Sequence, residues 1–455
     1  MPEINFAKYK QALNKSYIKR LGRVSQVVGL TIESVGPDVS IGDLCQIRAS
    51  KYSEAIRAEV VGFKGSHILL MPLGNMGGIG PGSIVEAMDE PLSIRVSDAL
   101  LGRVLNGLGE PMDGKGDITT GDLFPIFNMP PNPLVRDRIH KPLPLGVKAI
   151  DGLLTIGKGQ RIGIFAGSGV GKSTLMGMIA RNTRADVNVI SLVGERGREV
   201  RDFIEKDLGE EGVKRSVLVI ATSDQPALVR TKCAEVATAI AEYFRDQGKD
   251  VLLMMDSLTR FAMAQREVGL AIGEPPVSRG YTPSVFAVMP KLLERAGNSD
   301  KGSITGMYTV LVDGDDLTEI VTDTARGILD GHIVLNRKLA NKNHYPAIDV
   351  LASVSRVMGD VVTKPHRQVS NEMKKSMAVY ADAEDLINIG AYVAGSSADI
   401  DDAIAKHPAV TSFLTQAVEE KFEYEDSVRR MTEIMGAAES PAGRTPPPAK
   451  AAPRR

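Results

Sequence analysis

The residues best suited to chemistry in this 455-residue chain form a glycine-rich run, AGSGVGKST, at residues 166–174. Glycine has no Cβ, so the backbone N–H groups around the three glycines can converge on anionic oxygens. Lys172 is placed to reach the β- and γ-phosphates of a nucleoside triphosphate, and the Ser173 hydroxyl is placed to bind Mg²⁺. The run therefore predicts a phosphate-binding loop.

A strand and a helix must hold this loop in place. The apolar run RIGIF at residues 161–165 indicates a buried strand, and Leu175, Met178 and Ile179 share one face of the helix that follows. The positive N-terminal end of that helix adds to the attraction for phosphate. The loop departs from the G-x-x-x-x-G-K-[ST] pattern at its first position, where alanine is small enough for the turn. The loop residues assigned to nucleotide binding are Ala166, Gly167, Ser168, Gly169, Val170, Gly171, Lys172, Ser173 and Thr174.

Two carboxylates at the ends of apolar strands extend this site. Asp256 follows the run VLLMM at residues 251–255, where the water shell of Mg²⁺ needs an acidic partner. Glu195 ends the strand after the loop helix, where a carboxylate can orient the water that attacks a γ-phosphate. Asp256 alone would be a weak signal, because aspartate often ends a strand at a turn, and Glu195 alone would favour an ordinary exposed strand end. Combined with the loop, they favour hydrolysis of a triphosphate.

Composition sets limits on the rest of the chain. Its length suggests two to four domains, and a hydrophobic content of 43% with a net charge of −1 is ordinary for a globular protein. This charge balance argues against a protein that coats nucleic acid. The two cysteines, Cys45 and Cys233, fall in different predicted domains, which favours a reducing cytoplasm. We expect no secretion signal and no membrane-spanning run, so any membrane contact is expected to be peripheral.

The N-terminal third contains three stretches that differ in composition. Residues 1–21 are basic and helix-prone, which is compatible with a solvated helix or with a docking helix for a partner protein or an anionic lipid surface. Residues 22–93 contain short β-like runs separated by glycine and proline turns, which predict a small β-barrel domain. The segment 120–146 is rich in proline and is expected to be an extended strap.

The remaining two thirds predict three further parts. Residues 94–366 form the expected nucleotide-binding domain, because buried strands alternate with helices there, as in a mainly parallel sheet. Residues 367–436 are expected to form a helical domain, with one helical stretch running from 409 to 431. Residues 437–455 are expected to be a disordered tail, because their composition cannot build a core.

Four segments resemble the catalytic core of the rotary F-type ATPase β subunit: residues 167–174, 194–196, 256–261, and 345–349 with 353–356. Further strings resemble the branch of ATPases that serves flagellar export and type III secretion, namely RGYTPSVF at 279–286, LERAG at 293–297, GSITG at 302–306, VDGDD at 312–316, LDGHIVL at 329–335 and NHYPA at 343–347. The resemblance covers about residues 20 to 435. It implies an α/β fold with a RecA-like P-loop NTPase core, an N-terminal β-barrel and a C-terminal helical domain.

The resemblance also implies roles for individual residues. Lys172 and Ser173 would hold phosphate and Mg²⁺, Asp256 would support the metal, and Glu195 would polarise the attacking water. Arg196, Arg260 and Arg356 would supply positive charge near a γ-phosphate, with Arg356 reaching the nucleotide of a neighbouring subunit as an arginine finger. Tyr345 would stack on adenine. Spacing alone would leave Tyr345 a core side chain and Arg356 a surface one.

Tyr345 and Arg356 are only eleven residues apart and are assigned to different nucleotides, so we expect a ring, most simply a homohexamer. The resemblance implies a cytoplasmic ATPase, peripherally associated with the inner-membrane export apparatus, that uses ATP and Mg²⁺ to promote release of export substrates from chaperones. Its implied partners are a stator-like regulatory protein at the N-terminal helix, a stalk protein at the ring centre, export chaperone–substrate complexes and the export gate.

Three alternatives remain open at this stage. The injectisome version of the same enzyme shares these motifs. A rotary ATP synthase catalytic subunit is less favoured, because the C-terminal region lacks the clustered acids that face a rotor stalk. An RNA translocase on the same core would need stacking aromatics in its barrel, and residues 22–90 offer only Tyr52 and Phe63.

Overall fold

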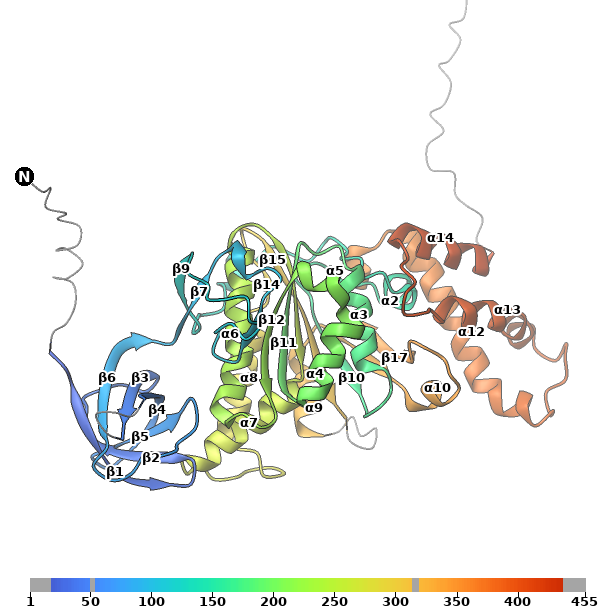
Figure 1. The fold of residues 1–455 in the computed structure, drawn as a ribbon. Coiled ribbons are helices and arrows are strands. Elements are labelled where there is room, and N and C mark those ends of the chain that lie inside the picture. The colour runs from blue at the N-terminus through green and yellow to red at the C-terminus, as the bar shows by residue number, and fades with distance from the viewer. Residues whose placement is uncertain (1–17, 50–53, 313–318, 437–455) are drawn as a thin grey trace, which may run out of the picture.

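The computed structural model describes residues 18–49, 54–312 and 319–436. The expected basic N-terminal helix lies almost wholly outside the described residues, as do the tail 437–455 and most of the VDGDD string. A barrel, a helix-covered sheet and a helical C-terminal part follow one another along the molecule (Figure 1). This arrangement confirms the predicted fold class.

A closed barrel forms the N-terminal part, with strand order β1-β2-β5-β4-β3-β6 and β6 pairing back onto β1. Alternate side chains point inward and fill it, among them Val24, Ile47 and Val60. Gly22 lets the chain cross itself closely, since a Cβ there would lie 2.0 Å from the carbonyl oxygen of Gly36. The barrel strands are β1 (Leu21–Val28), β2 (Thr31–Val35), β3 (Asp43–Arg48), β4 (Ile56–Lys64), β5 (His67–Pro72) and β6 (Ile84–Pro91).

The central sheet has the order β17-β16-β10-β15-β13-β11-β12-β8. Its strands run parallel except β17, which pairs antiparallel with β16, and the short β14, which pairs antiparallel with β15. The strands are β8 (Val104–Asn106), β10 (Arg161–Ala166), β11 (Val187–Glu195), β12 (Ser216–Thr222), β13 (Asp250–Asp256), β14 (Gly297–Asn298), β15 (Ser303–Leu311), β16 (Gly331–Leu335) and β17 (Ile348–Ser355).

Helices cover both faces of this sheet, which explains its near-continuous apolar strands. In β13, for example, Val251, Leu253 and Met255 enter the core on one side, and Leu252 and Met254 enter the core on the other. The first face carries α6 (Ala227–Asp246), α7 (Leu258–Ala271), α8 (Pro283–Leu293) and α9 (Ile320–Ile328). The second carries α2 (Lys148–Leu153), α3 (Lys172–Asn182), α4 (Gly197–Asp202), a π-helical turn (Phe203–Leu208) and α5 (Gly209–Lys214).

The proline-rich strap between the barrel and the sheet is extended, as its composition predicts. Within it β9 (Asp122–Pro125) pairs with β7 (Ser93–Val96), and a single 3₁₀ turn (Pro133–Val135) begins at a proline. Another 3₁₀ turn (Asp98–Leu100) precedes β8. The strap thus delivers the chain to the start of α2 and β10.

The C-terminal part consists of α12 (Lys364–Asn388), α13 (Ala398–Leu414) and α14 (Tyr424–Met435), with the shorter α10 (Arg337–Asn341) and α11 (Met358–Val361) before them. The expectation of one helical stretch from 409 to 431 is wrong, because the chain leaves helical geometry after Leu414. Gln416 explains the break. Its backbone N–H donates to Tyr345 O at 2.9 Å, and its side chain bonds the backbone of Gly146 and Lys148. Tertiary hydrogen bonds replace helical ones there.

A buried charge cluster joins the barrel to the sheet domain. The ammonium group of Lys232, on α6, lies 2.9 Å from a carboxylate oxygen of Glu59 on β4 and 3.1 Å from one of Glu235. The ring of Phe127, from the strap, lies 4.1 Å from the same ammonium group. The Lys232 side chain is only 3% exposed, so its charge balances two carboxylates that are screened from water.

We expect Lys232→Met to destabilise the protein by about 3–5 kcal/mol, because the buried Glu59 and the partly buried Glu235 would lose their counter-charge. Urea unfolding followed by circular dichroism measures the effect. Lys214→Met is the matched control: its ion pair with Glu211 is exposed, and its loss should change stability by less than about 1 kcal/mol. Equal stability of the two variants would show that the cluster does not hold the barrel in place.

Candidate active site

The phosphate-binding loop turns sharply between β10 and α3. Ala166 is buried at the end of β10, and Val170 is buried beneath the loop. Gly169 and Gly171 have φ values of +76° and +89°, which other residues rarely adopt. No atom lies within 4 Å of where a Cβ on Gly169 would sit, so backbone groups there face open space. The strand–loop–helix context predicted from the sequence is confirmed.

Lys172, the first residue of α3, lies among the predicted acidic residues. Its ammonium group donates a hydrogen bond to Asp256 Oδ1 and lies 3.8 Å from Glu195 Oε1. All three side chains are at most 13% exposed. The start of α3 and the ends of β11 and β13 therefore meet at the carboxyl edge of the sheet.

Burial and neighbouring charge shift the pKa values of this cluster. Burial raises the pKa of Glu195 to about 7, repulsion from Asp256 adds to the rise, and Lys172 partly offsets it. Burial opposes the charged form of Lys172, but attraction to Asp256 and Glu195 outweighs it and raises the pKa of the ammonium group. Lys172 is therefore charged at neutral pH, and Glu195 titrates near neutrality.

Sequence reasoning missed Thr309, on β15. Its hydroxyl donates a hydrogen bond of 2.7 Å to Asp256 Oδ1, the oxygen that also binds Lys172. This bond fixes the carboxylate at the end of β13. A threonine inside the apolar run ITGMYTVLV is the signal that would have pointed to it.

The two predicted arginines near the strand end differ in burial. A Cβ on Gly194 would lie 3.2 Å from Arg260 Cβ, so the glycine lets Arg260 approach the end of β11. Among the described residues, the buried Nε of Arg260 has no hydrogen-bond partner. Arg196 instead points outward, with its side chain 78% exposed and 3.6 Å from Glu199. The structure thus places Arg260 beside Gly194, the residue before Glu195, whereas the side chain of Arg196 is exposed.

Tyr345 lies beside the loop at a cavity of about 550 Å³. Its ring would contact a Cβ placed on Gly171 at 3.5 Å, and 39% of the residue is exposed. The far wall comes from the segment 416–419, whose first residue binds Tyr345 through the backbone. Sequence reasoning missed this wall, since nothing near Gln416 marks it. Residues that line the cavity include Gly169, Thr174, Met178, Tyr345, Gln416 and Val418.

Ser168, Ser173 and Thr174 complete the loop. Ser168 is exposed at its tip, whereas Ser173 and Thr174 are partly buried in the first turn of α3. The hydroxyl of Thr174 bonds Asp207 of the π-helical turn. Ser173 lies between Lys172 and Thr174 in this first turn.

Arg356 lies far from this cluster. It directly follows β17, which runs antiparallel to β16, so it sits at the edge of the sheet opposite the phosphate-binding loop. Strand β10 separates the two edges by six residues, roughly 20 Å at about 3.3 Å per residue. The guanidinium group is exposed and donates to Arg326 O at 3.2 Å. Arg356 therefore cannot reach the loop of its own chain.

Two general properties of the described residues complete the picture. No cluster of three or more histidine, cysteine or acidic side chains that could hold a metal ion occurs within them. Over the same residues, none of the helices combines the length and the apolar character needed to cross a bilayer.

Fold and site together define a RecA-like P-loop ATPase with an N-terminal barrel and a C-terminal helical part. Residues 146–355 match the model of the ATP synthase alpha/beta family, nucleotide-binding domain, and residues 24–89 match the β-barrel domain of that family. Residues 362–433 match the C-terminal domain of the type III secretion ATPase EscN. The matches follow the barrel, the sheet domain and the helical part in turn.

Individual relatives narrow this class. The chain is 58% identical over 424 residues to the flagellum-specific ATP synthase of Bacillus subtilis, covering 92% of this chain and 96% of the relative. It is 51% identical over 416 residues to the type 3 secretion system ATPase of Xanthomonas euvesicatoria, covering 91% and 94%. The structure of assembled EscN with its central stalk EscO, from enteropathogenic E. coli, is similar with a TM-score of 0.84 and 46% identity, covering 91% and 100%. The chain belongs to the family of flagellum-specific ATP synthases and type III secretion ATPases, which confirms the resemblance.

We expect Glu195→Gln to stabilise the nucleotide-free protein at pH 8. Glu195 binds its proton more tightly folded than unfolded, so its favourable contribution is complete below about pH 4.5 and lost as pH rises through about 7. Removing the charge should therefore raise the unfolding free energy by up to about 3 kcal/mol at pH 8 and by little at pH 5.

Thermal melting at the two pH values measures this difference. Glu211→Gln is the matched control, because that carboxylate is 85% exposed on helix α5. A Glu195→Gln variant that melts below the parent at pH 8 would contradict the assigned environment.

Proposed function

We propose that this chain is the Mg²⁺-dependent ATPase of a bacterial flagellar protein export apparatus, working as a homohexameric ring. The observation that carries the catalytic part is the meeting of Lys172, Glu195 and Asp256 at the phosphate-binding loop. Family membership supports the export role, and the flagellum-specific relative in Bacillus subtilis favours the flagellar system. The type 3 secretion relative at 51% identity keeps the injectisome as the second candidate.

In the proposed reaction the loop binds the triphosphate through the backbone of residues 166–174, and Lys172 leaves the acids to meet the β- and γ-phosphates. Glu195, ionised above about pH 7, orients and polarises the water that attacks the γ-phosphate. Arg260, with a buried unpaired Nε, supplies positive charge to the γ-phosphate. Arg196, whose side chain is exposed, adds positive charge at the outer edge of the site. Tyr345 stacks on adenine in the cavity beside the loop.

The donor set at the loop fits Mg²⁺. The Ser173 hydroxyl and the Asp256 carboxylate are oxygen ligands, and this ion typically takes one or two carboxylates together with substrate phosphates. When bound, the metal neutralises charge that develops on the phosphate oxygens. Asp256 is already held by Thr309, which keeps its carboxylate oriented when Lys172 turns away.

Assembly is supported by the position of Arg356. An arginine at the edge opposite its own loop can act on a nucleotide only in another copy of the chain, where its planar charge grips two oxygens. EscN, which is 46% identical, is described in an assembled form with a central stalk, and this supports a ring with a stalk protein at its centre.

The other expected partners rest on the same family membership. We propose a stator-like regulatory protein at the basic N-terminal segment, export chaperone–substrate complexes, and the export gate. The enzyme would be cytoplasmic and peripherally associated with the inner-membrane export apparatus, without binding nucleic acid. We further propose domain boundaries at residues 21/22, 93/94, 366/367 and 436/437, although α12 begins three residues before the third of these. Affinity purification from native cells separates the flagellar from the injectisome system by its co-purifying components.

We expect Lys172→Ala and Glu195→Gln to abolish ATP hydrolysis by different routes. The first should weaken ATP binding at least about tenfold, because the triphosphate loses its main positive contact. The second should leave binding nearly unchanged while lowering kcat at least about 100-fold, because water activation is lost. Fluorescent nucleotide titration and phosphate release measure the two effects. Parental turnover by Glu195→Gln would refute the role of this carboxylate.

We expect Arg356→Ala protomers to bind ATP normally but to hydrolyse it about 10³-fold more slowly. Mixing them with Lys172→Ala protomers should restore part of the activity, because some interfaces then join an intact loop to an intact arginine. Phosphate release is measured across mixing ratios, with formation of mixed oligomers checked by native mass spectrometry. Mixed rings without recovered activity would contradict action between subunits.

A further inference from the structure

The segment that carries Arg356 is held by the start of strand β10. The backbone N–H of Arg356 donates to Asp330 O at 3.0 Å. Asp330 directly precedes β16, and the first residue of β16, Gly331, pairs with Ser355. The carbonyl oxygen of Asp330 thus holds, through a hydrogen bond, the backbone of the residue proposed to act on the neighbouring nucleotide.

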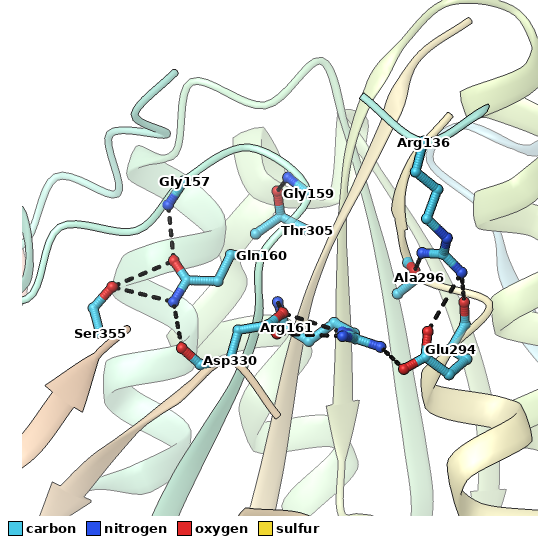
Figure 2. A network of polar contacts seen from close by, with 10 residues as sticks. All are labelled: Arg136, Gly157, Gly159, Gln160, Arg161, Glu294, Ala296, Thr305, Asp330 and Ser355. Atoms are coloured by element: carbon cyan, nitrogen blue, oxygen red, sulfur yellow. Dashed lines mark hydrogen bonds and ion pairs between the residues drawn. The ribbon is translucent and has the colours of Figure 1, made fainter. Parts of the chain in front are cut away.

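Gln160, immediately before β10, bridges both sides of this junction (Figure 2). It is fully buried, and its Nε2 donates to Asp330 O and to Ser355 Oγ, both at 3.1 Å. Its Oε1 accepts from Gly157 N at 2.9 Å, and Ser355 Oγ donates onward to Thr155 O at 2.9 Å. Each polar atom of the amide has a partner, so the side chain has one fixed orientation.

Arg161, the first residue of β10, locks Asp330 from the other side (Figure 2). Its backbone N–H and Nε donate to Asp330 Oδ2 at 3.0 and 3.1 Å, and its terminal nitrogen donates to Oδ1 at 3.2 Å. The backbone N–H of Asp330 returns a bond of 2.8 Å to Arg161 O. Four hydrogen bonds between two residues leave Asp330 little freedom relative to β10.

We propose that Gln160, Asp330 and Ser355, here called the β10 clamp, are positioning residues that set the reach of Arg356 towards the neighbouring active site. The inference rests on the proposed role of Arg356 between subunits. Strand β10 ends at the phosphate-binding loop, which binds the chain's own nucleotide. The clamp therefore ties Arg356, which acts on the neighbouring nucleotide, to the strand that carries this loop. A displacement of about 1 Å at a catalytic group can cost about 100-fold in rate, so such fixing has kinetic value.

The chain supplies a matched control within the same network. Arg161 also pairs with Glu294, which in turn contacts Arg136 of the strap (Figure 2). This second arm touches the same guanidinium group but makes no contact with Ser355 or Arg356 among those that the structure describes. Loss of Glu294 therefore perturbs the network on the side away from the arginine finger.

The experiment compares Asp330→Asn and Ser355→Ala with Glu294→Gln in full-length protein. We expect the two clamp variants to lower kcat by about 10- to 100-fold while changing the affinity for ATP less than about twofold. Glu294→Gln should stay within about twofold of the parental kcat. Oligomer formation and melting temperature are measured for each variant, and Ser355→Ala keeps the test valid if Asp330→Asn fails to fold.

Mixed rings separate positioning of Arg356 from damage to the loop at the other end of β10. A clamp variant has its own intact loop, so mixing with Lys172→Ala protomers, whose Arg356 is correctly held, should recover activity as Arg356→Ala does. No recovery, while Arg356→Ala recovers, would overturn the proposal by placing the defect at the variant's own loop. Parental kcat in both clamp variants would also overturn it. Failure of the Arg356→Ala mixture itself would refute the arginine finger, and the clamp with it.

Discussion

Strand β10 sets the constraint on which the rest of the site depends. Its carboxyl end leads into the phosphate-binding loop. At its amino end, Gln160, just before the strand, and Arg161, its first residue, hold the segment that bears Arg356. An extended strand keeps its two ends apart, so the phosphate-binding loop and the segment bearing Arg356 lie roughly 20 Å from each other. With the roles proposed for Lys172 and Arg356, one chain cannot use both residues on a single nucleotide. Assembly is the arrangement that resolves this separation.

At the phosphate-binding loop, the buried charges lower the stability of the fold and raise the pKa of Glu195. Glu195 and Asp256 are both screened from water and share one ammonium group, so one lysine balances two carboxylates. This raises the pKa of Glu195 to about 7 and leaves the carboxylate ready to exchange a proton near neutral pH. The hydroxyl of Thr309 holds the Asp256 carboxylate in place.

The sequence predicts the loop, Glu195 and Asp256 because each is a short-range pattern, an apolar run followed by a residue of special chemistry. Only the family resemblance assigns roles to Tyr345 and Arg356, since nothing in their spacing distinguishes them from a core tyrosine and a surface arginine. The contacts that hold them come from residues distant in sequence: Gln416 reaches Tyr345 from the helical part, and Gln160 reaches Ser355 across 195 positions. Periodicity carries no information about such contacts. For the same reason the sequence pattern predicts one helix where the structure has the end of α13 and the start of α14, which tertiary hydrogen bonds separate.

The most direct test of a site completed between copies is the specific ATPase activity of the unaltered protein over a wide range of concentrations. Sedimentation velocity at the same concentrations gives the fraction in the assembled form. If Arg356 acts on a neighbouring nucleotide, activity per chain should fall in parallel with the assembled fraction, because the site exists only after assembly. Constant specific activity at concentrations where the protein sediments as a monomer would contradict the account.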